Sequence, residues 1–415
     1  MPEKKEFVLT SFQEDIFKEQ AARQTVRGTV VQNMDMLIGY IGEKGVPVSG
    51  VKKHFSQGQL AKINDQLVHP LHIRLKRPLQ KSYPHINALY LLLRASGLGT
   101  LVSEGKKSQL QINANMLQAW QELNPTERYF SLFAAWWCRG SDEIVGEREG
   151  LGVHDPLFRC LDYIIKLPRN GVCLEDKKDA MNYLRFSPGF HSLALLELFC
   201  LVRIEYGEPE GGQGWCIEKI TPTGWGRAVI ETVHRATQLE LELEEDVPLL
   251  ELKTSAFERW KTLVQPFFSD WKTCLPGHET PFQAGVHIVK VSQGKAWRKI
   301  AISGESTFEA FAEAILQAFD FDRDHLYQFI YNDRYGLKKN INHTALEEAP
   351  FTDETRLGEI SCLPGMDMVF LFDFGDSWEF QVVVEEIDAD TAVESEPVLL
   401  KSQGKAPEQY PGYDE

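Results

Sequence analysis

Two segments of the chain follow the same succession of apolar and polar stretches, and this internal repeat constrains the fold more strongly than any other feature. In the first, an apolar run at 89–98 is followed by a short apolar stretch, a polar turn, a second short stretch and an amphipathic segment that ends near Leu123. In the second, Leu193–Phe199 begins the same succession, a glycine-rich turn at 207–214 separates the short stretches, and Thr221-Pro222 is typical of a helix start. Each segment predicts helix, strand, turn, strand and helix, and a strand pair joined by a polar turn after a buried helix is typical of a winged helix.

The length of the chain predicts more than one domain. A single hydrophobic core rarely serves more than roughly 250–300 residues, and the chain has 415. We place a helical, winged-helix-like region at 1–140 and a second one at 141–275, and we interpret Pro276-Gly277-His278-Glu279 as a linker. Between the repeats lies an aromatic stripe with helical spacing that we expect in the core: Tyr129, Phe130, Phe133, Trp136 and Trp137.

Beyond the linker, the spacing of apolar residues changes from helical to alternating. Two alternating stretches precede an amphipathic helix at Thr307–Phe319, a third follows it at Leu326–Tyr331, and a long irregular section leads to a hairpin around 374–377. The order of two strands, helix, strand, loop and two strands predicts an α+β layer that resembles a β-grasp. We assign this module to 281–390 and an extended acidic tail to 391–415, so the fold class expected for the whole chain is α+β.

The C-terminal module is similar to the plasmid pRiA4b ORF-3-like family, and five pieces carry the resemblance in their order and spacing. These pieces are Ala296–Ile300, Ala314–Asp320, Asp324–Phe329, Asp353–Leu357 and Phe372–Glu379. The resemblance covers Gly285 to about Ile387, and it implies a fold and a module boundary but no reaction. The chain has Phe380 where many relatives have His, and its tail lacks the cysteines that relatives often carry. A metal site built from those positions is therefore incomplete in this chain.

Charged residues gather at the predicted C-terminal hairpin. Asp373 and Asp376 flank its turn, Glu379 follows, and His325 precedes the strand that we expect next to them. Clustered carboxylates with a histidine could bind a divalent cation or supply acid and base groups. The alternative is that an Asp in a glycine-containing turn accepts hydrogen bonds from its own backbone and organises the hairpin. In that case we expect Trp297 and Trp378 to be core anchors and Arg298 to be a surface or paired charge.

A positively charged segment interrupts an otherwise acidic chain. Arg74, Lys76, Arg77 and Lys81 follow one another with His69, His72 and His85 around them and no acidic residue among them, and Tyr83 is interleaved. Such a segment is either a solvated face or a surface that contacts the phosphates of nucleic acid. Because the formal net charge is −16, DNA binding would have to depend on this one face.

Several function classes are disfavoured by what the sequence lacks. It contains no G-x-S-x-G, H-E-x-x-H or P-loop motif and no G-x-G-x-x-G that opens a helix. The seven cysteines form no C-x-x-C pair, which predicts free thiols and neither a disulfide framework nor a zinc site. No run approaches the ~20 apolar residues of a membrane helix, and residues 1–6 do not resemble a secretory signal.

These observations favour a cytoplasmic, non-enzymatic binding or regulatory protein. We expect a macromolecular partner of unknown identity, with DNA as a candidate through the winged-helix-like repeats, and we expect no membrane association and no cofactor. We assign no catalytic residue. The alternative is a metal-dependent hydrolase or nuclease that uses the carboxylates of the C-terminal hairpin, and the metal would then be unknown.

Overall fold

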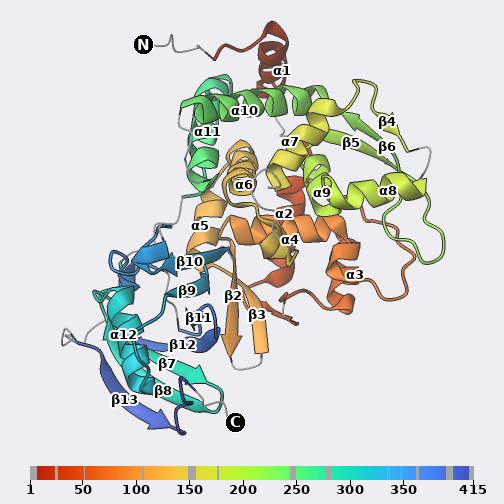
Figure 1. Cartoon of the computed structure of the whole chain (residues 1–415). Helices are drawn as coiled ribbons and strands as arrows, with labels where there is room; N and C mark the ends of the chain where they lie inside the picture. Colours follow the sequence, from red (N-terminus) through yellow and green to blue (C-terminus); the bar gives the residue numbers. More distant parts are fainter. Residues whose placement is uncertain are drawn as a thin grey trace. The chain divides into compact units, whose positions relative to one another are not determined.

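The structure, a computed structural model, forms two compact units (Figure 1). The N-terminal unit is built from Met1–Leu101 and Lys107–Pro276, and the C-terminal unit chiefly from Gly277–Glu415. The residues that the structure describes are 7–23, 27–50, 52–104, 107–147, 156–174, 177–243, 249–276, 282–333, 335, 337–346, 348–360, 364–388 and 396–410. The fold class is α+β, as predicted. Most of the predicted linker, residues 277–279, lies outside the described residues.

The first repeat lies within a longer run of helices and strands that contains a small sheet. The strands of this sheet have the spatial order β1-β3-β2. The elements in chain order are α2 (Val30–Ile41), β1 (Val46–Val48), α3 (Gln57–Asn64), α4 (Pro84–Ala95), β2 (Gly99–Glu104), β3 (Lys107–Ile112) and α5 (Ala114–Glu122). The predicted succession of helix, strand, turn, strand and helix is therefore confirmed in α4 to α5, although the middle of the turn, residues 105–106, lies outside the described residues.

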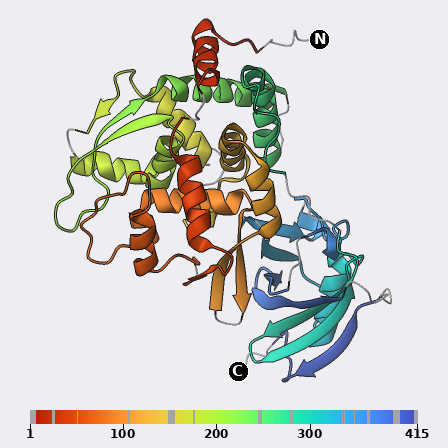
Figure 2. The same cartoon turned by 180° about the vertical axis from the view of Figure 1, so that it is seen from behind.

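The second repeat has the same element order and the same strand order, β4-β6-β5. Its helices and strands are the yellow to green elements of Figure 2. Its elements are α7 (Pro156–Lys166), β4 (Val172–Cys173), α8 (Lys177–Phe186), α9 (Phe190–Leu198), β5 (Val202–Tyr206), β6 (Ile217–Pro222) and α10 (Gly224–Leu243). The succession predicted here, α9 to α10, is confirmed as well. The sequence did not predict that the equivalence extends backwards to α2 and α7, because those helices share no obvious pattern of residues.

The remaining helices of the N-terminal unit build an aromatic core. They are α1 (Ser11–Ala21), α6 (Pro125–Arg139) and α11 (Leu249–Val264), with short 3-10 helices η1 (Gln80–Ser82), η2 (Asp142–Val145) and η4 (Gln265–Phe267). The aromatic stripe of α6 is buried, as expected. Phe130 stacks on Trp271 with ring centroids 3.7 Å apart, and Trp136 stacks on Phe199 at 5.4 Å. These contacts join α6 to the end of the N-terminal unit and to the residue that follows α9.

The C-terminal unit is one sheet of seven strands in the order β10-β9-β11-β12-β7-β8-β13, and every ladder in it is antiparallel. Its strands are β7 (Val286–Gln293), β8 (Ala296–Ser303), β9 (Tyr327–Asn332), β10 (Lys338–Asn342), β11 (Asp367–Phe372), β12 (Trp378–Asp388) and β13 (Val398–Gln403). One helix, α12 (Phe308–Phe319), packs against a face of the sheet, and short 3-10 helices η5 (Thr344–Leu346) and η6 (Leu357–Glu359) lie in the connections. Thr307 caps α12 by accepting a hydrogen bond from the backbone N–H of Ala310 at 3.2 Å.

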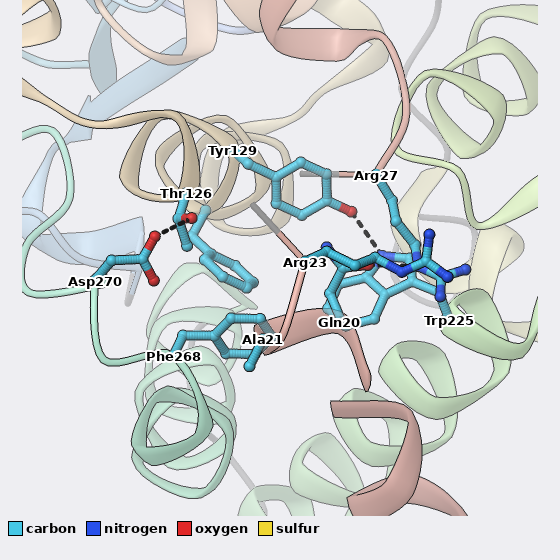
Figure 3. A pocket seen from close by; sticks show the side chains of 10 residues that line it. Gln20, Ala21, Arg23, Arg27, Thr126, Tyr129, Trp225, Phe268 and Asp270 are labelled. Carbon is cyan, nitrogen blue, oxygen red and sulfur yellow. Dashed lines mark hydrogen bonds between the residues drawn. The ribbon is translucent and has the colours of Figure 1, made fainter. Parts of the chain in front are cut away.

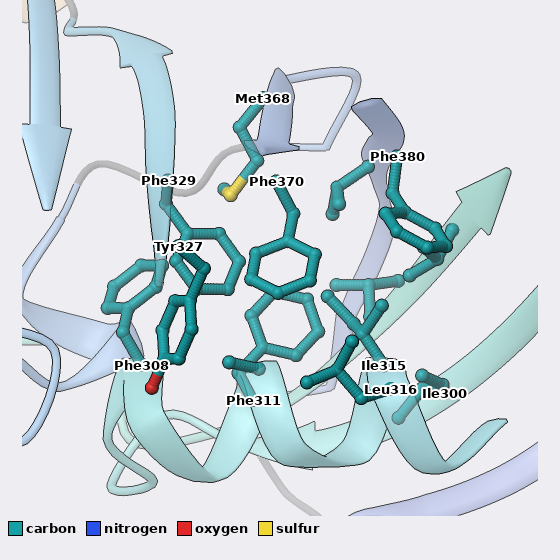
Figure 4. Close-up of a cluster of buried hydrophobic side chains, with 14 of the residues drawn as sticks. Ile300, Phe308, Phe311, Ile315, Leu316, Tyr327, Phe329, Met368, Phe370 and Phe380 are labelled. Carbon is teal, nitrogen blue, oxygen red and sulfur yellow. The ribbon is translucent and has the colours of Figure 1, made fainter. Parts of the chain in front are cut away.

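The core of this unit lies between α12 and the sheet (Figure 4). Phe308 and Phe311 of α12 contact Phe329 of β9, with ring centroids 4.9 and 5.4 Å apart. The two predicted hairpins and the helix are confirmed. The structure adds β10 in a section predicted to be irregular and β13 in the region expected to be an extended tail. Both are edge strands, and their polar or uniformly exposed residues do not show the alternation that marks a strand.

Among the described helices, none has the length and apolar character needed to cross a membrane. Among the described residues, the six cysteines form no disulfide, and Cys362 lies outside these residues.

Candidate functional site

The C-terminal hairpin brings His325 and Asp373 together, but the carboxylate of Asp373 is engaged by the turn. Its Oδ1 accepts hydrogen bonds from the backbone N–H groups of Gly375 at 2.9 Å and Asp376 at 3.4 Å. Asp373 has φ +55°, a left-handed conformation that Asp tolerates better than most residues. His325 Nε2 lies 3.5 Å from Asp373 Oδ2 and 3.7 Å from Asp324 Oδ1. This is the turn-organising arrangement that the sequence analysis gave as the alternative to a metal cluster.

The other two members of the predicted cluster do not join it. Asp376 is exposed at the tip of the turn. Glu379 is also exposed, and because side chains alternate along β12 it lies on the face opposite the buried Phe380. Within the part of the chain that the structure describes, no group of three or more His, Cys, Asp and Glu side chains is placed to hold a metal ion.

The C-terminal tail contacts the segment that precedes β9, and the sequence did not predict this contact. The Tyr410 hydroxyl donates a hydrogen bond to Asp324 Oδ2 at 2.6 Å, and Gln409 Nε2 donates one to Asp324 Oδ1 at 3.2 Å. The hydrogen bond from Tyr410 lowers the pKa of Asp324, and the same bond raises the pKa of Tyr410 to about 12. The Gln409 side-chain oxygen also accepts the backbone N–H of Asp322 at 2.6 Å. The tail is therefore fastened to the residues that precede β9.

The basic segment is displayed on the surface of the N-terminal unit. Arg74, Lys76, Arg77 and Lys81 are all exposed, and none of them has a carboxylate partner among the described residues. The Arg74 N–H donates to the Gln213 carbonyl at 2.8 Å, and the Gly212 N–H donates to the Arg74 carbonyl at 2.9 Å. The segment that connects α3 to α4 is thus held against the glycine-rich turn of the second repeat.

Two histidines of this segment do not add to a positive face. His72 Nδ1 lies 3.2 Å from Glu208 Oε2, and Glu208 is an exposed residue of the glycine-rich turn. His85 is only 4% exposed. Its Nε2 lies 2.7 Å from Glu197 Oε2, to which the Tyr206 hydroxyl also donates at 2.6 Å. The expectation that His85 forms part of an exposed basic patch is therefore wrong, because the apolar surroundings of α4 bury it.

The helix that precedes the strand pair is buried in both repeats. Every residue of α4 from Pro84 to Ala95 is buried, and seven of the nine residues of α9 are buried. The two helices pack against each other. In helix-turn-helix proteins the corresponding helix enters the major groove of DNA and reads base edges. In this protein neither helix has a face free for that purpose.

A small pocket lies near α1 and α6 (Figure 3). Its aromatic wall includes Tyr129 and Trp225, and Trp225 Nε1 donates to the Tyr129 hydroxyl at 2.9 Å. That hydroxyl donates in turn to the Phe199 carbonyl at 2.8 Å, and burial raises the pKa of Tyr129. Arg27 lines the pocket but bonds Gln20 and Glu19. Its residues come from elements far apart in the sequence, so no local signal marks it.

One family model matches the C-terminal unit. Residues 281–413 match the family described as plasmid pRiA4b ORF-3-like protein, which confirms the resemblance seen in the sequence. The chain therefore carries a plasmid pRiA4b ORF-3-like module. The solved structure of a protein of unknown function from Methanosarcina mazei Go1 is similar at 22% identity and a TM-score of 0.26, with 29% of this chain and 71% of that chain covered. No curated protein matches the chain.

Proposed function

We propose that this is a cytoplasmic, non-enzymatic binding protein whose N-terminal unit consists of two winged-helix repeats and associates with DNA through the basic segment. The repeated order of helices and strands, with the equivalent strand orders β1-β3-β2 and β4-β6-β5, supports the winged-helix assignment. The burial of α4 against α9 indicates that the repeats use these helices to pack on each other. DNA would then be contacted elsewhere.

One observation carries the DNA proposal, namely four exposed cations on one anchored segment. Arg74, Lys76, Arg77 and Lys81 project from a connection whose backbone is hydrogen-bonded to Gln213 and Gly212. Lysine and arginine on a fixed backbone can neutralise phosphates and release the counterions that surround DNA. Contacts to phosphates position a protein on the duplex without reading its sequence. We therefore expect weak binding that depends little on sequence and strongly on salt.

The hydrolase or nuclease alternative depends on His325, Asp373, Asp376 and Glu379. Asp373 accepts the amides of its own turn, and Glu379 lies in the strand beyond it. No observation favours a reaction over turn formation at these residues, so we do not propose one.

The test is a comparison of two variants that lose the same charge. In one, Arg74, Lys76, Arg77 and Lys81 are all replaced by Gln. In the control, four lysines that are exposed elsewhere are replaced by Gln, and these are Lys44, Lys62, Lys272 and Lys295. Binding of full-length protein to duplex DNA is measured by fluorescence anisotropy between low and moderate salt.

We expect the wild type and the control to bind at low salt and to lose affinity as salt rises. The logarithm of the binding constant should fall by about 0.9 per phosphate contact for each unit of log salt concentration. The basic-segment variant should show a flatter dependence and weaker binding. Equal curves for the two variants, or no binding by the wild type at low salt, would contradict the proposal and leave a protein partner as the better interpretation.

A further inference from the structure

Three lysines stand directly opposite one another across adjacent strands of the C-terminal sheet. Lys290 of β7 is the Cα partner of Lys299 of β8, and Lys299 is the Cα partner of Lys401 of β13. Neighbouring strands lie about 4.7–4.9 Å apart, and like charges directly opposite each other destabilise a sheet. Glu385 compensates Lys299 at 2.5 Å. Neither Lys290 nor Lys401 has a carboxylate partner among the residues that the structure describes.

Trp297 occupies the next position on the same face. Lys290 Nζ lies 5.0 Å and Lys401 Nζ 5.8 Å from the centre of the Trp297 ring. This face points away from α12, because the neighbouring Arg298 is buried on the other side with its guanidinium 4.7 Å from the Phe319 ring of that helix. Trp297 is therefore half-buried on an open sheet face, and the expectation that it anchors the core is wrong.

The fold places Lys401 in this row by means of an irregularity in β13. Leu399 pairs with Ile300, but the next pair is Lys401 with Lys299, so Leu400 is an extra residue. Without this bulge, the side chain opposite Lys299 would be Leu400, because a shift of one residue exchanges the two faces of a strand. Bulges commonly re-aim a side chain in this way. Arg298 then holds the end of β13 through hydrogen bonds from Nη1 to the Gln403 carbonyl at 3.2 Å and the Gly404 carbonyl at 3.3 Å.

We infer that this patch, defined by Lys290, Trp297, Lys299 and Lys401, binds single-stranded nucleic acid. The half-buried ring of Trp297 on the open sheet face, flanked by ammonium groups, offers a stacking surface for one base and cations for the phosphates on either side of it. The row of like charges gains stability when an anion is bound. An acidic peptide would use the lysines but would have no need of the ring. This patch lies in the C-terminal unit and would bind a single strand, whereas the basic segment lies in the N-terminal unit and is proposed to bind duplex DNA.

The experiment measures binding of full-length protein to a labelled oligothymidylate by fluorescence anisotropy across a range of salt concentrations. The variants are Trp297→Leu, Trp297→Phe and K290Q/K401Q. The control is K295Q/K405Q, which removes two exposed lysines of the same unit that lie outside the row. Melting temperatures establish that all four variants are folded.

We expect Trp297→Leu to weaken binding roughly fivefold to a hundredfold, since stacking on an aromatic ring contributes that much per base. Trp297→Phe should retain most of the affinity. K290Q/K401Q should reduce the salt slope by about 1.4, because each phosphate contact to a single strand contributes roughly 0.7. The K295Q/K405Q control should leave both affinity and slope close to those of the wild type.

Two results would overturn the inference. One is unchanged affinity in folded Trp297→Leu, and the other is equal binding of polyglutamate to wild type and Trp297→Leu, which would identify an acidic peptide site. The basic-segment variant separates this inference from the proposed function. It should lose duplex binding and keep oligothymidylate binding, whereas Trp297→Leu should do the reverse.

Discussion

Trp297 and Arg298 are neighbours in sequence, and neither lies where it was expected. The expectation placed Trp297 in the core and Arg298 at the surface or in a charge pair, following the usual ranking of side chains by burial. The alternation of β8 places Arg298 on the same face as Ala296 and Ile300, which are both buried. Arginine can be buried when its donors meet carbonyl groups, and here Nε donates to the Ala318 carbonyl at 2.7 Å. The strand register was predictable, but the carbonyls that satisfy Arg298 come from distant residues.

Trp378 and Trp297, the two tryptophans of the module, allow the contribution of a ring packed on the core to be compared with that of a ring on the open sheet face. The ring of Trp378 packs edge-on against Phe321 with centroids 5.0 Å apart, and it contacts the buried core. Both rings are half-buried, but that of Trp378 packs against the core, so Trp378→Ala should lower the free energy of unfolding of the C-terminal unit by about 3 kcal/mol, the lower end of the range for truncating a packed aromatic residue. Trp297→Ala should lower it by less than about 1 kcal/mol, because this ring lies on the face away from the core. Urea denaturation of both variants measures this, and equal losses would show that the two rings are buried alike.

At the scale of elements, the repeat was predictable from sequence because each helix and strand pair has its own local pattern. Pro84 at the first helical position and the apolar run after it mark α4. Thr221-Pro222, expected at a helix start, instead ends β6, and Thr223 caps α10 by accepting the backbone N–H of Gly226 at 2.8 Å. What the sequence could not indicate is that α4 and α9 cover each other. A sequence pattern that is apolar on all sides of a helix predicts that the helix is buried, but it does not indicate which surface covers the helix.

The ion pair of Asp142 joins three of these elements and has a predictable pH dependence. Asp142 in η2 is 4% exposed, and its carboxylate lies 2.8 Å from His191 Nε2 of α9 and 2.6 Å from Arg159 Nη2 of α7. Burial alone would raise the pKa of Asp142, but the hydrogen bonds and charges of His191 and Arg159 outweigh it and lower that pKa. The ionised carboxylate is therefore bound more favourably in the folded state than in the unfolded chain.

We expect Asp142→Asn to reduce the free energy of unfolding by about 3 kcal/mol at pH 7, since the change removes the ionised partner of the half-buried Arg159 and of the buried His191. Because the folded pKa lies below the unfolded value of about 3.9, this contribution is present above pH ~4 and disappears as the pH falls through the folded pKa. Urea denaturation from pH 7 to pH 3 should show the difference between wild type and variant shrinking. Asp162→Asn is the control, since its exposed pair with Lys166 should contribute less than about 0.5 kcal/mol. A difference that stays constant with pH would contradict the assignment.

For the whole molecule, the change of apolar spacing near Gly285 was enough to predict a separate C-terminal module. The candidate sites were harder to predict because they depend on contacts between distant segments. His85 is paired with Glu197 and Tyr206, and Asp324 is paired with Tyr410. The residues near His85 and Asp324 in the sequence do not indicate which distant side chains form hydrogen bonds with them. The basic segment was predictable because exposure is the ordinary state of Arg74 and its neighbours.

Comparing the stabilities of two fragments tests whether the tail is part of the C-terminal module. A fragment from Pro281 to Glu415 should fold alone, because its core lies between its own helix and its own sheet. A fragment that ends at Asp388 lacks β13, so the edge of β8 and its unpaired backbone groups would face solvent. It would also lose the carbonyls of Gln403 and Gly404 that accept from the buried Arg298. We expect the longer fragment to unfold cooperatively with dispersed amide resonances. The shorter one should be at least about 3 kcal/mol less stable, since it loses the β13 ladder and two of the carbonyl acceptors of the buried Arg298, which keeps those of Ala318 and Trp297. Equal stability of the two fragments would show that the tail is an appendage and that Arg298 finds other acceptors.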